Sequence, residues 1–133
     1  MSLVFADTFY FLALLNRDDA AHSKARAISE EKTARMITTA WVLTEVADAL
    51  AASNLRHIFL RLIQALKSDP NTMIVPPTQL LFDQALDFYA KRLDHDWTLT
   101  DCTSFVVMAQ QGITEALTGD RHFGQAGFKP LLS

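Results

Sequence analysis

Short apolar runs alternate along the chain with longer segments in which apolar residues recur every three or four positions. The short runs predict buried strands, and the longer segments predict amphipathic helices. The predicted strands are Leu3–Ala6, Arg35–Thr38, Met73–Val75, Glu115–Leu117 and Phe128–Leu131. The predicted helices are Thr8–Leu15, Asp18–Lys32, Ala40–Ser53, Leu55–Ser68, Gln79–Leu93 and Thr100–Gln111, with a short helical turn at Arg121–Gly124.

Turn residues mark several of the boundaries. Asp69-Pro70-Asn71 ends one helix, Pro76-Pro77 closes a strand, and Gly112 stops the helix that precedes it. Strands joined by helical crossovers pair in parallel, and a parallel sheet is covered on both faces. We therefore predict an α/β fold, a three-layer α/β/α sandwich around a mainly parallel sheet, with residues 1–133 forming one domain. A site in such a fold forms outside the carboxyl ends of the strands.

Composition supports a folded globule with long helices. Half of the 133 residues are hydrophobic, and the chain has only four glycines and four prolines, fewer than an all-β fold with many tight turns needs. The single cysteine cannot form an intramolecular disulfide, which fits a reducing compartment. No apolar run approaches the roughly 20 residues of a membrane span, and the N-terminus has no basic leader. We expect a cytoplasmic protein with no membrane partner.

The net charge of −3 argues weakly against a nucleic-acid partner, because phosphate binding usually needs surplus lysine and arginine. The position of the acids changes this picture. Setting aside four acids that the pattern places at one site leaves 11 acids against 12 bases.

Those four acids fall at strand ends or helix starts. Asp7 directly follows the first strand, Asp101 opens a helix, and Asp120 follows the strand Glu115–Leu117. Glu45 lies within a helix, among apolar neighbours. Because the carboxyl ends of parallel strands meet at one edge of the sheet, we expect the four side chains to lie near one another.

Each acid also has an ordinary explanation. Asp7 could cap the helix that follows it, and Asp101 could complement a helix dipole or close a capping box with Thr98. Asp120 could stabilise a turn, and Glu45 could face solvent. Nothing structural, however, requires all four acids to fall at the same edge of one sheet.

Clustered carboxylates repel one another, and a divalent cation relieves that repulsion. Mg²⁺ and Mn²⁺ prefer oxygen ligands, and such an ion can activate water against a phosphodiester. The other candidates are weaker. The four histidines have no metal-type spacing and read as surface or interface residues, and Cys102 without a histidine partner reads as packing.

Four segments carry a resemblance to a known family. FADTFYFLALL, TTAWVLTEVADAL, LTDCTSFVVM and LTGDRHFGQAGF are similar, in order and spacing, to the four motif regions of PIN-domain ribonucleases, which include the VapC-type toxins of toxin–antitoxin pairs. The resemblance covers essentially the whole chain.

The resemblance implies that Asp7, Glu45, Asp101 and Asp120 coordinate Mg²⁺ or Mn²⁺ and support hydrolysis of single-stranded RNA. It also implies a homodimer and, if the chain is a toxin, an antitoxin protein as partner. The alternative reading is a non-catalytic RNA- or protein-binding module on a PIN-like fold. A phosphotransfer site of the D-x-D kind is disfavoured because Asp7-Thr8-Phe9 lacks the second acid.

Neighbouring positions suggest supporting roles. Thr8 and Ser104 resemble polar positions that support the acidic site in the family. Asp48, three positions after Glu45, either joins the site in a supporting role or points to solvent. Arg121 and His122 either contact RNA phosphate or are ordinary turn residues.

Overall fold

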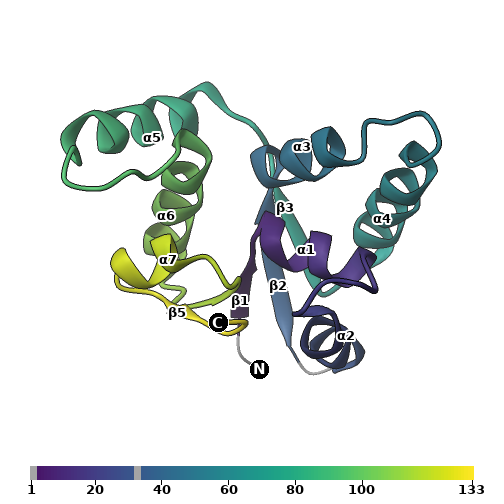
Figure 1. Ribbon diagram of the computed structural model, residues 1–133. Helices are drawn as coiled ribbons and strands as arrows, with labels where there is room; N and C mark the ends of the chain where they lie inside the picture. Colours follow the sequence, from purple (N-terminus) through teal and green to yellow (C-terminus); the bar gives the residue numbers. More distant parts are fainter. Residues whose placement is uncertain (1–2, 32–33) are drawn as a thin grey trace.

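The computed structural model describes residues 3–31 and 34–133, and five strands form one sheet within them (Figure 1). The strands are β1 (Leu3–Ala6), β2 (Arg35–Thr39), β3 (Thr72–Val75), β4 (Glu115–Leu117) and β5 (Lys129–Pro130). Their spatial order is β3-β2-β1-β4-β5, and each neighbouring pair is parallel. The predicted α/β class and parallel sheet are therefore confirmed.

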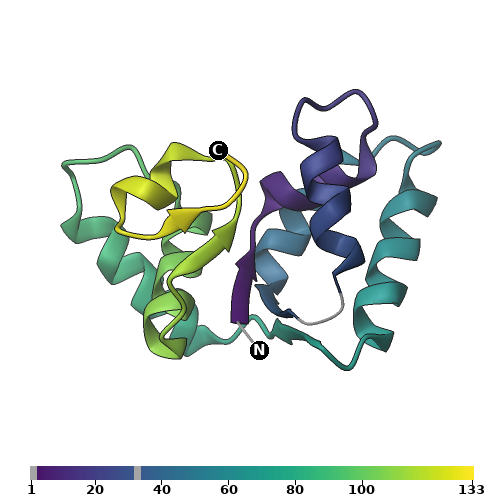
Figure 2. The ribbon, with the colours of Figure 1, turned by 90° about the horizontal axis from the view of Figure 1, so that it is seen from below.

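Seven helices flank the sheet in the described part of the chain. They are α1 (Thr8–Leu15), α2 (His22–Glu30), α3 (Ala40–Ala49), α4 (Arg56–Ser68), α5 (Gln79–Lys91), α6 (Leu99–Gln111) and α7 (Arg121–Gln125). Helices α1 to α4 lie on one side of β1, and α5 to α7 lie on the other (Figures 1 and 2). None of the helices in residues 3–31 and 34–133 has the length and apolar character that a membrane span requires.

The core centres on β1, the middle strand. Phe5 is fully buried and lies 6.3 Å, ring to ring, from Phe123 of α7. Phe105 of α6 packs edge-on against Phe123 at 5.0 Å. The hydroxyl of buried Thr38 on β2 donates to the Ala6 carbonyl at 2.8 Å. These contacts fix the carboxyl end of β1 and the start of α6, where the acids lie.

Helix α6 begins and ends as its sequence predicts. The Thr98 hydroxyl accepts a hydrogen bond from the Asp101 backbone N–H, and the Asp101 carboxylate accepts one from the Thr98 N–H, which completes a capping box. Gly112 ends the helix with a φ of 67°, a left-handed conformation that favours glycine.

Helix α2 begins at His22, so the predicted start at Asp18 was wrong. The Asp18 N–H donates to the Asn16 side chain and the Ala21 N–H to the Asp19 side chain, at 3.0 and 2.8 Å. Such side-chain turns compete with helical hydrogen bonds and delay the helix. The predicted end at Lys32 lies outside the described residues.

Helix α3 ends at Ala49, four residues before the predicted Ser53. The Leu50 N–H already bonds back to the carbonyls of Val46 and Ala47, and the chain then turns into α4. The alanines and serine that follow are compatible with either conformation, so the sequence has no stop signal there.

Helix α5 buries a narrower face than the pattern predicts. Leu81 and Ala85 are buried, whereas Leu80 is 68% exposed and Tyr89 is 46% exposed. The helix ends at Lys91 rather than Leu93. The other differences from the predicted boundaries are of one or two residues. Among the strands, β2 extends to Thr39, β3 starts at Thr72, and β5 covers only Lys129–Pro130. Among the helices, α4 starts at Arg56, α6 starts at Leu99, and α7 extends to Gln125.

Candidate active site

Four elements bring the predicted acids to the carboxyl edge of the sheet. Asp7 follows β1 directly, and Asp120 lies between β4 and α7. Glu45 is in the second turn of α3, and Asp101 is the third residue of α6. Strands β1 and β4 are neighbours, which brings the first and last of these acids together.

Asp7 is only 5% exposed, although it occupies the N-cap position of α1. Its side chain makes no capping hydrogen bond to that helix. Instead, its Oδ2 accepts a hydrogen bond of 2.8 Å from the Thr118 hydroxyl, which links β1 to the end of β4. The capping explanation therefore does not account for this aspartate.

The pKa of Asp7 is raised from 3.8 to about 7. Burial is the main cause, and the nearby carboxylates of Asp101 and Glu45 raise it further. The hydrogen bond from Thr118 and, to a smaller extent, the backbone N–H of the adjacent Thr8 offset part of this shift. The carboxylates of Asp7, Glu45 and Asp101 are thus close enough that ionising all three at once is unfavourable.

Glu45 is half-buried, and its Oε1 accepts a 2.6 Å hydrogen bond from the Thr8 hydroxyl. This contact connects the start of α1 to α3 and directs the carboxylate inward. The ordinary explanation, that Glu45 faces solvent, does not fit this placement.

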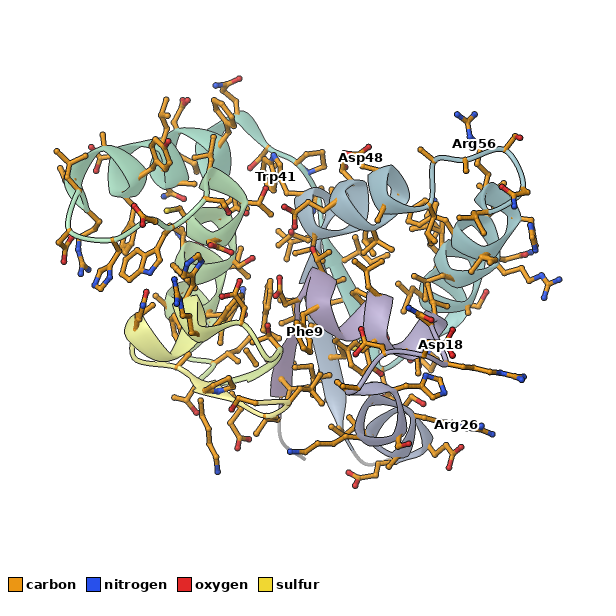
Figure 3. The ribbon with its side chains drawn as sticks, viewed as in Figure 1. Phe9, Asp18, Arg26, Trp41, Asp48 and Arg56 are labelled. Atoms are coloured by element: carbon orange, nitrogen blue, oxygen red, sulfur yellow. The ribbon has the colours of Figure 1, made fainter. Side chains whose placement is uncertain are left out.

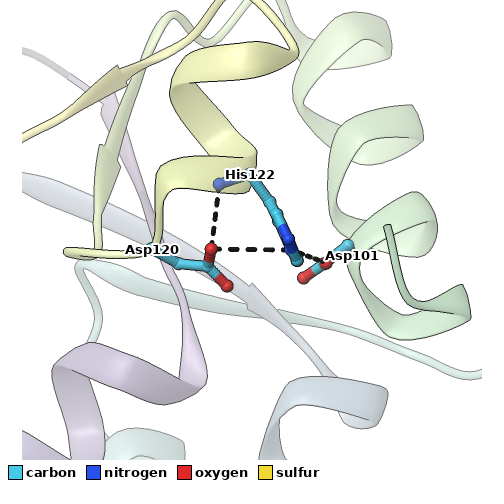
Figure 4. Close-up of side chains that lie close together, drawn as sticks. All are labelled: Asp101, Asp120 and His122. Atoms are coloured by element: carbon cyan, nitrogen blue, oxygen red, sulfur yellow. Dashed lines mark hydrogen bonds and ion pairs between the residues drawn. The ribbon is translucent and has the colours of Figure 1, made fainter. Parts of the chain in front are cut away.

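Asp101 keeps its capping role and faces the other acids. It is 7% exposed, and its Oδ2 accepts from the Thr98 N–H at 3.1 Å. The same oxygen lies 2.9 Å from Nδ1 of His122 (Figure 4). The structural and the site interpretations of this residue are therefore both compatible with its geometry.

Asp120 caps α7 through Oδ1, which accepts from the His122 backbone N–H at 2.9 Å. The same Oδ1 lies 3.5 Å from the His122 Nδ1 (Figure 4). Asp101, Asp120 and His122 each offer a ligand atom, and these atoms all lie within 4.8 Å of one another.

Thr118 and His122 are the contacts that the sequence did not reveal. The Thr118 hydroxyl donates to Asp7 and accepts from the Asp120 N–H at 3.0 Å, so one buried side chain orients two acids. For His122 the sequence predicts only an RNA contact or a surface position in a turn. For Thr118, the sequence did contain one indication: a threonine two positions before an aspartate, directly after a strand, is typical of a side-chain turn.

Gly119, between Thr118 and Asp120 in the sequence, is covered by the ring of Phe9. A Cβ atom there would lie 2.5 Å from Cζ of Phe9. Figure 3 shows Phe9 projecting from α1 into the space between the two groups of helices. The glycine thus permits close approach of α1 to the loop after β4.

The remaining predicted helpers lie apart from these contacts. The buried Ser104 hydroxyl donates to the Thr100 carbonyl one turn earlier at 3.3 Å. Asp48 is exposed on the outer surface of α3 (Figure 3). Arg121 is exposed beside Asp120. Within residues 3–31 and 34–133, no hydrogen bond joins these three side chains to the acids.

Cys102 is a packed side chain, as expected. It is 1% exposed, and burial together with the neighbouring Asp101 carboxylate raises the pKa of the thiol to about 11. A thiol with this pKa is protonated at neutral pH and is a poor nucleophile.

The donor set fits a divalent cation. Burial and two neighbouring carboxylates raise the pKa of Asp7, a cost that a cation would offset, and Asp101, Asp120 and His122 provide converging ligand atoms. In Glu45, Asp101 and Asp120, the hydrogen bonds from the described residues go to one oxygen and leave the second available. Carboxylate oxygens are the ligands that Mg²⁺ and Mn²⁺ prefer.

Comparison with known proteins gives matches along nearly the whole chain. The profile of a family described as PIN domain matches residues 4–129. A Mycobacterium tuberculosis protein named 23S rRNA-specific endonuclease VapC20 is 30% identical to the chain over 128 residues, which are 95% of either protein. The same protein from a second strain matches equally.

Three solved structures are also similar to the chain along nearly its whole length. The crystal structure of Mycobacterium tuberculosis VapC20, described as a sarcin-ricin loop cleaving toxin, has a TM-score of 0.85 and 28% identity, covering 99% of this chain and 100% of that one. VapBC-1 from nontypeable Haemophilus influenzae has a TM-score of 0.63 at 12% identity, covering 93% and 91% of the two chains. FitAcB from Neisseria gonorrhoeae has a TM-score of 0.64 at 16% identity, covering 98% and 96%. The last two structures share the fold.

Proposed function

The chain belongs to the PIN domain family, and from that premise we propose that it is an endoribonuclease that hydrolyses phosphodiester bonds of single-stranded RNA with Mg²⁺ or Mn²⁺. The observation that carries the proposal is the crowding of carboxylates around Asp7. Burial and two neighbouring acids raise the pKa of Asp7 to about 7, a cost that a bound cation removes.

Asp7, Glu45, Asp101 and Asp120 would hold the ion. When bound, the ion supplies Lewis-acid polarisation of the phosphate and lowers the pKa of a coordinated water. The chain's own residues keep the ligands in place. Threonine hydroxyls hold Asp7 and Glu45, at 2.8 and 2.6 Å. Helix N-termini hold Asp101 and Asp120.

The RNA substrate is proposed from the relatives. VapC20 is named as specific for 23S rRNA and described as cleaving the sarcin-ricin loop, so single-stranded segments within structured RNA are the first substrates to test. The exposed guanidinium of Arg121, next to Asp120, is the phosphate contact that we propose on the protein side. For Ser104 we propose only a role in the packing of α6, and for Asp48 only that of an exposed residue on the surface of α3.

We further propose that the protein is the toxin of a toxin–antitoxin pair, a homodimer that acts in the cytoplasm and is inhibited by an antitoxin. The support is its likeness to VapC20, which is described as a toxin. Co-purification with the product of the adjacent reading frame tests the pairing, and sedimentation of the purified chain tests the dimer.

The catalytic proposal is tested with end-labelled RNA, with Mg²⁺, with Mn²⁺ and with EDTA. We expect cleavage with either ion, none with EDTA, and none for Asp101→Asn, which keeps the size of the side chain but loses its charge. Asp18→Asn is the matched control, since Asp18 is exposed in the turn that follows α1, at the end of that helix away from Asp7 (Figure 3). Cleavage by Asp101→Asn at the wild-type rate would refute the mechanism.

The alternative is a binding module on the same fold without catalysis. The crowded acids favour catalysis, because a binding surface for RNA gains nothing from buried like charges. Calorimetric titration with Mn²⁺ separates the two proposals. RNA binding without any Mn²⁺ binding at the acids would favour the module.

A further inference from the structure

The imidazole of His122 lies among the acids rather than toward solvent. Its Nδ1 is 2.9 Å from Oδ2 of Asp101 and 3.5 Å from Oδ1 of Asp120 (Figure 4). The side chain is 19% exposed. It therefore lies between two carboxylates, one in the first turn of α6 and one at the N-cap of α7.

These separations are compatible with donors that share one ion. Nitrogen and oxygen donors lie about 2.1 Å from a small divalent cation, so adjacent donors in an octahedral site are about 3.0 Å apart. The 2.9 Å separation from Asp101 Oδ2 is close to this value, which is also the length of a hydrogen bond, and the 3.5 Å separation from Asp120 Oδ1 is slightly wider. The three ligand atoms also lie within 4.8 Å of one another.

The backbone holds the imidazole in place before any ion binds. The His122 N–H donates to Asp120 in the first turn of α7. The next residue, Phe123, is fully buried against Phe105 of α6, the helix that carries Asp101. Packing of α7 on α6 thus sets the distance between His122 and the Asp101 carboxylate.

We propose that His122 is a ligand of the metal ion, and that its nitrogen makes the site prefer Mn²⁺ to Mg²⁺. The proposal rests on the proposed metal-dependent function. Mg²⁺ selects oxygen donors and retains its waters, whereas imidazole nitrogen suits first-row transition ions. A site with one nitrogen among carboxylates therefore discriminates between the two cations that the acids alone would accept.

The competing explanation is that His122 only positions Asp101 through an N–H···O hydrogen bond. The substitution His122→Asn separates the two roles. The asparagine amide nitrogen reaches approximately the place of Nδ1 and still donates a hydrogen bond, but it has no imidazole lone pair for a metal. His57→Asn is the matched control, because His57 is exposed on α4.

The experiment measures binding of Mn²⁺ and of Mg²⁺ by calorimetry, together with the pulsed EPR spectrum of the Mn²⁺-loaded protein. We expect wild type and His57→Asn to prefer Mn²⁺ and to show coupling of the electron spin to a ¹⁴N nucleus. For His122→Asn we expect loss of that coupling and about a tenfold or greater weakening of Mn²⁺ binding, with Mg²⁺ binding changed much less.

Retention of the ¹⁴N coupling, or of the Mn²⁺ preference, in His122→Asn would overturn the proposal. That result would leave the proposed function intact as long as wild type binds the ion and Asp101→Asn does not. Absence of metal binding to wild type would instead refute the proposed function itself.

Discussion

Replacing Asp7 by asparagine measures how strongly the carboxylate cluster opposes ionisation. The asparagine keeps the shape of the side chain and an oxygen that accepts from Thr118, but it never carries a charge. The pKa of Asp7 is 3.8 in the unfolded chain and about 7 in the fold. The folded state therefore retains the Asp7 proton over a pH range in which the unfolded state loses it.

The sign of the pH effect follows from this difference. A pKa raised by folding contributes stability that is complete below about pH 4 and is lost as pH rises to about 7. At 1.36 kcal/mol per pKa unit, the loss is about 4 kcal/mol. Asp7→Asn has no such loss, so its stability relative to wild type should increase by about 4 kcal/mol between about pH 4 and about pH 8.

Urea denaturation in EDTA, at both pH values, measures this quantity. Subtracting the wild-type free energy of unfolding from that of the variant cancels the titration of other groups. Asp18→Asn, at an exposed position, should show no comparable pH dependence. Adding Mn²⁺ at about pH 8 should stabilise wild type but not Asp7→Asn. An equal difference between variant and wild type at the two pH values would refute the reasoning.

Two further predictions concern the loops around the cluster. Gly119→Ala should reduce the free energy of unfolding by about 1–3 kcal/mol, because the new Cβ would lie 2.5 Å from the ring of Phe9. Thermal melts of both variants measure this: Gly124→Ala, whose Cβ would have its nearest neighbour at 3.9 Å, should cause no loss of stability. Equal losses in the two variants would show that the Phe9 contact is not the cause. Thr98→Ala and Thr78→Ala each remove a helix cap and should each cost about 0.5–2 kcal/mol. Only Thr98→Ala should also weaken Mn²⁺ binding in calorimetry, since its capping box holds the Asp101 carboxylate. Unchanged Mn²⁺ binding in Thr98→Ala would show that this cap does not position the site.

The fold and the placement of the four acids were accessible from sequence because both depend on local patterns. Asp7 directly follows a strand, Asp120 caps the short helix after another strand, and Glu45 and Asp101 lie in the first two turns of their helices. A parallel sheet gathers those positions at one edge. The order of the motif segments then indicated the family, and the comparisons confirm that membership. The metal and the catalytic roles of the acids remain predictions.

The contacts that hold the acids in place were not accessible, because they join distant parts of the chain. Thr118 is 111 residues from Asp7, and no periodic pattern relates the two. His122 meets Asp101 only because α7 packs on α6, a packing that depends on aromatic side chains in the core. Helix ends at α2 and α3 were missed for a local reason, since side-chain turns and featureless alanine-rich segments leave weak boundaries.

The strand order has a consequence for synthesis of the protein. Strands β1, β2 and β3 are neighbours in the sheet, and all three precede residue 76. The other edge of β1 pairs with β4, which starts only at Glu115. Because chains emerge from the ribosome N-terminus first, Asp7 and Glu45 are made long before Asp120 and its loop. An unfinished chain therefore presents the open edge of an apolar strand, which favours association with other chains, and has no complete set of acids. For an enzyme proposed to act on RNA, this order means that the set of acids is complete only after the segment from β4 to α7 has been made and has paired with β1.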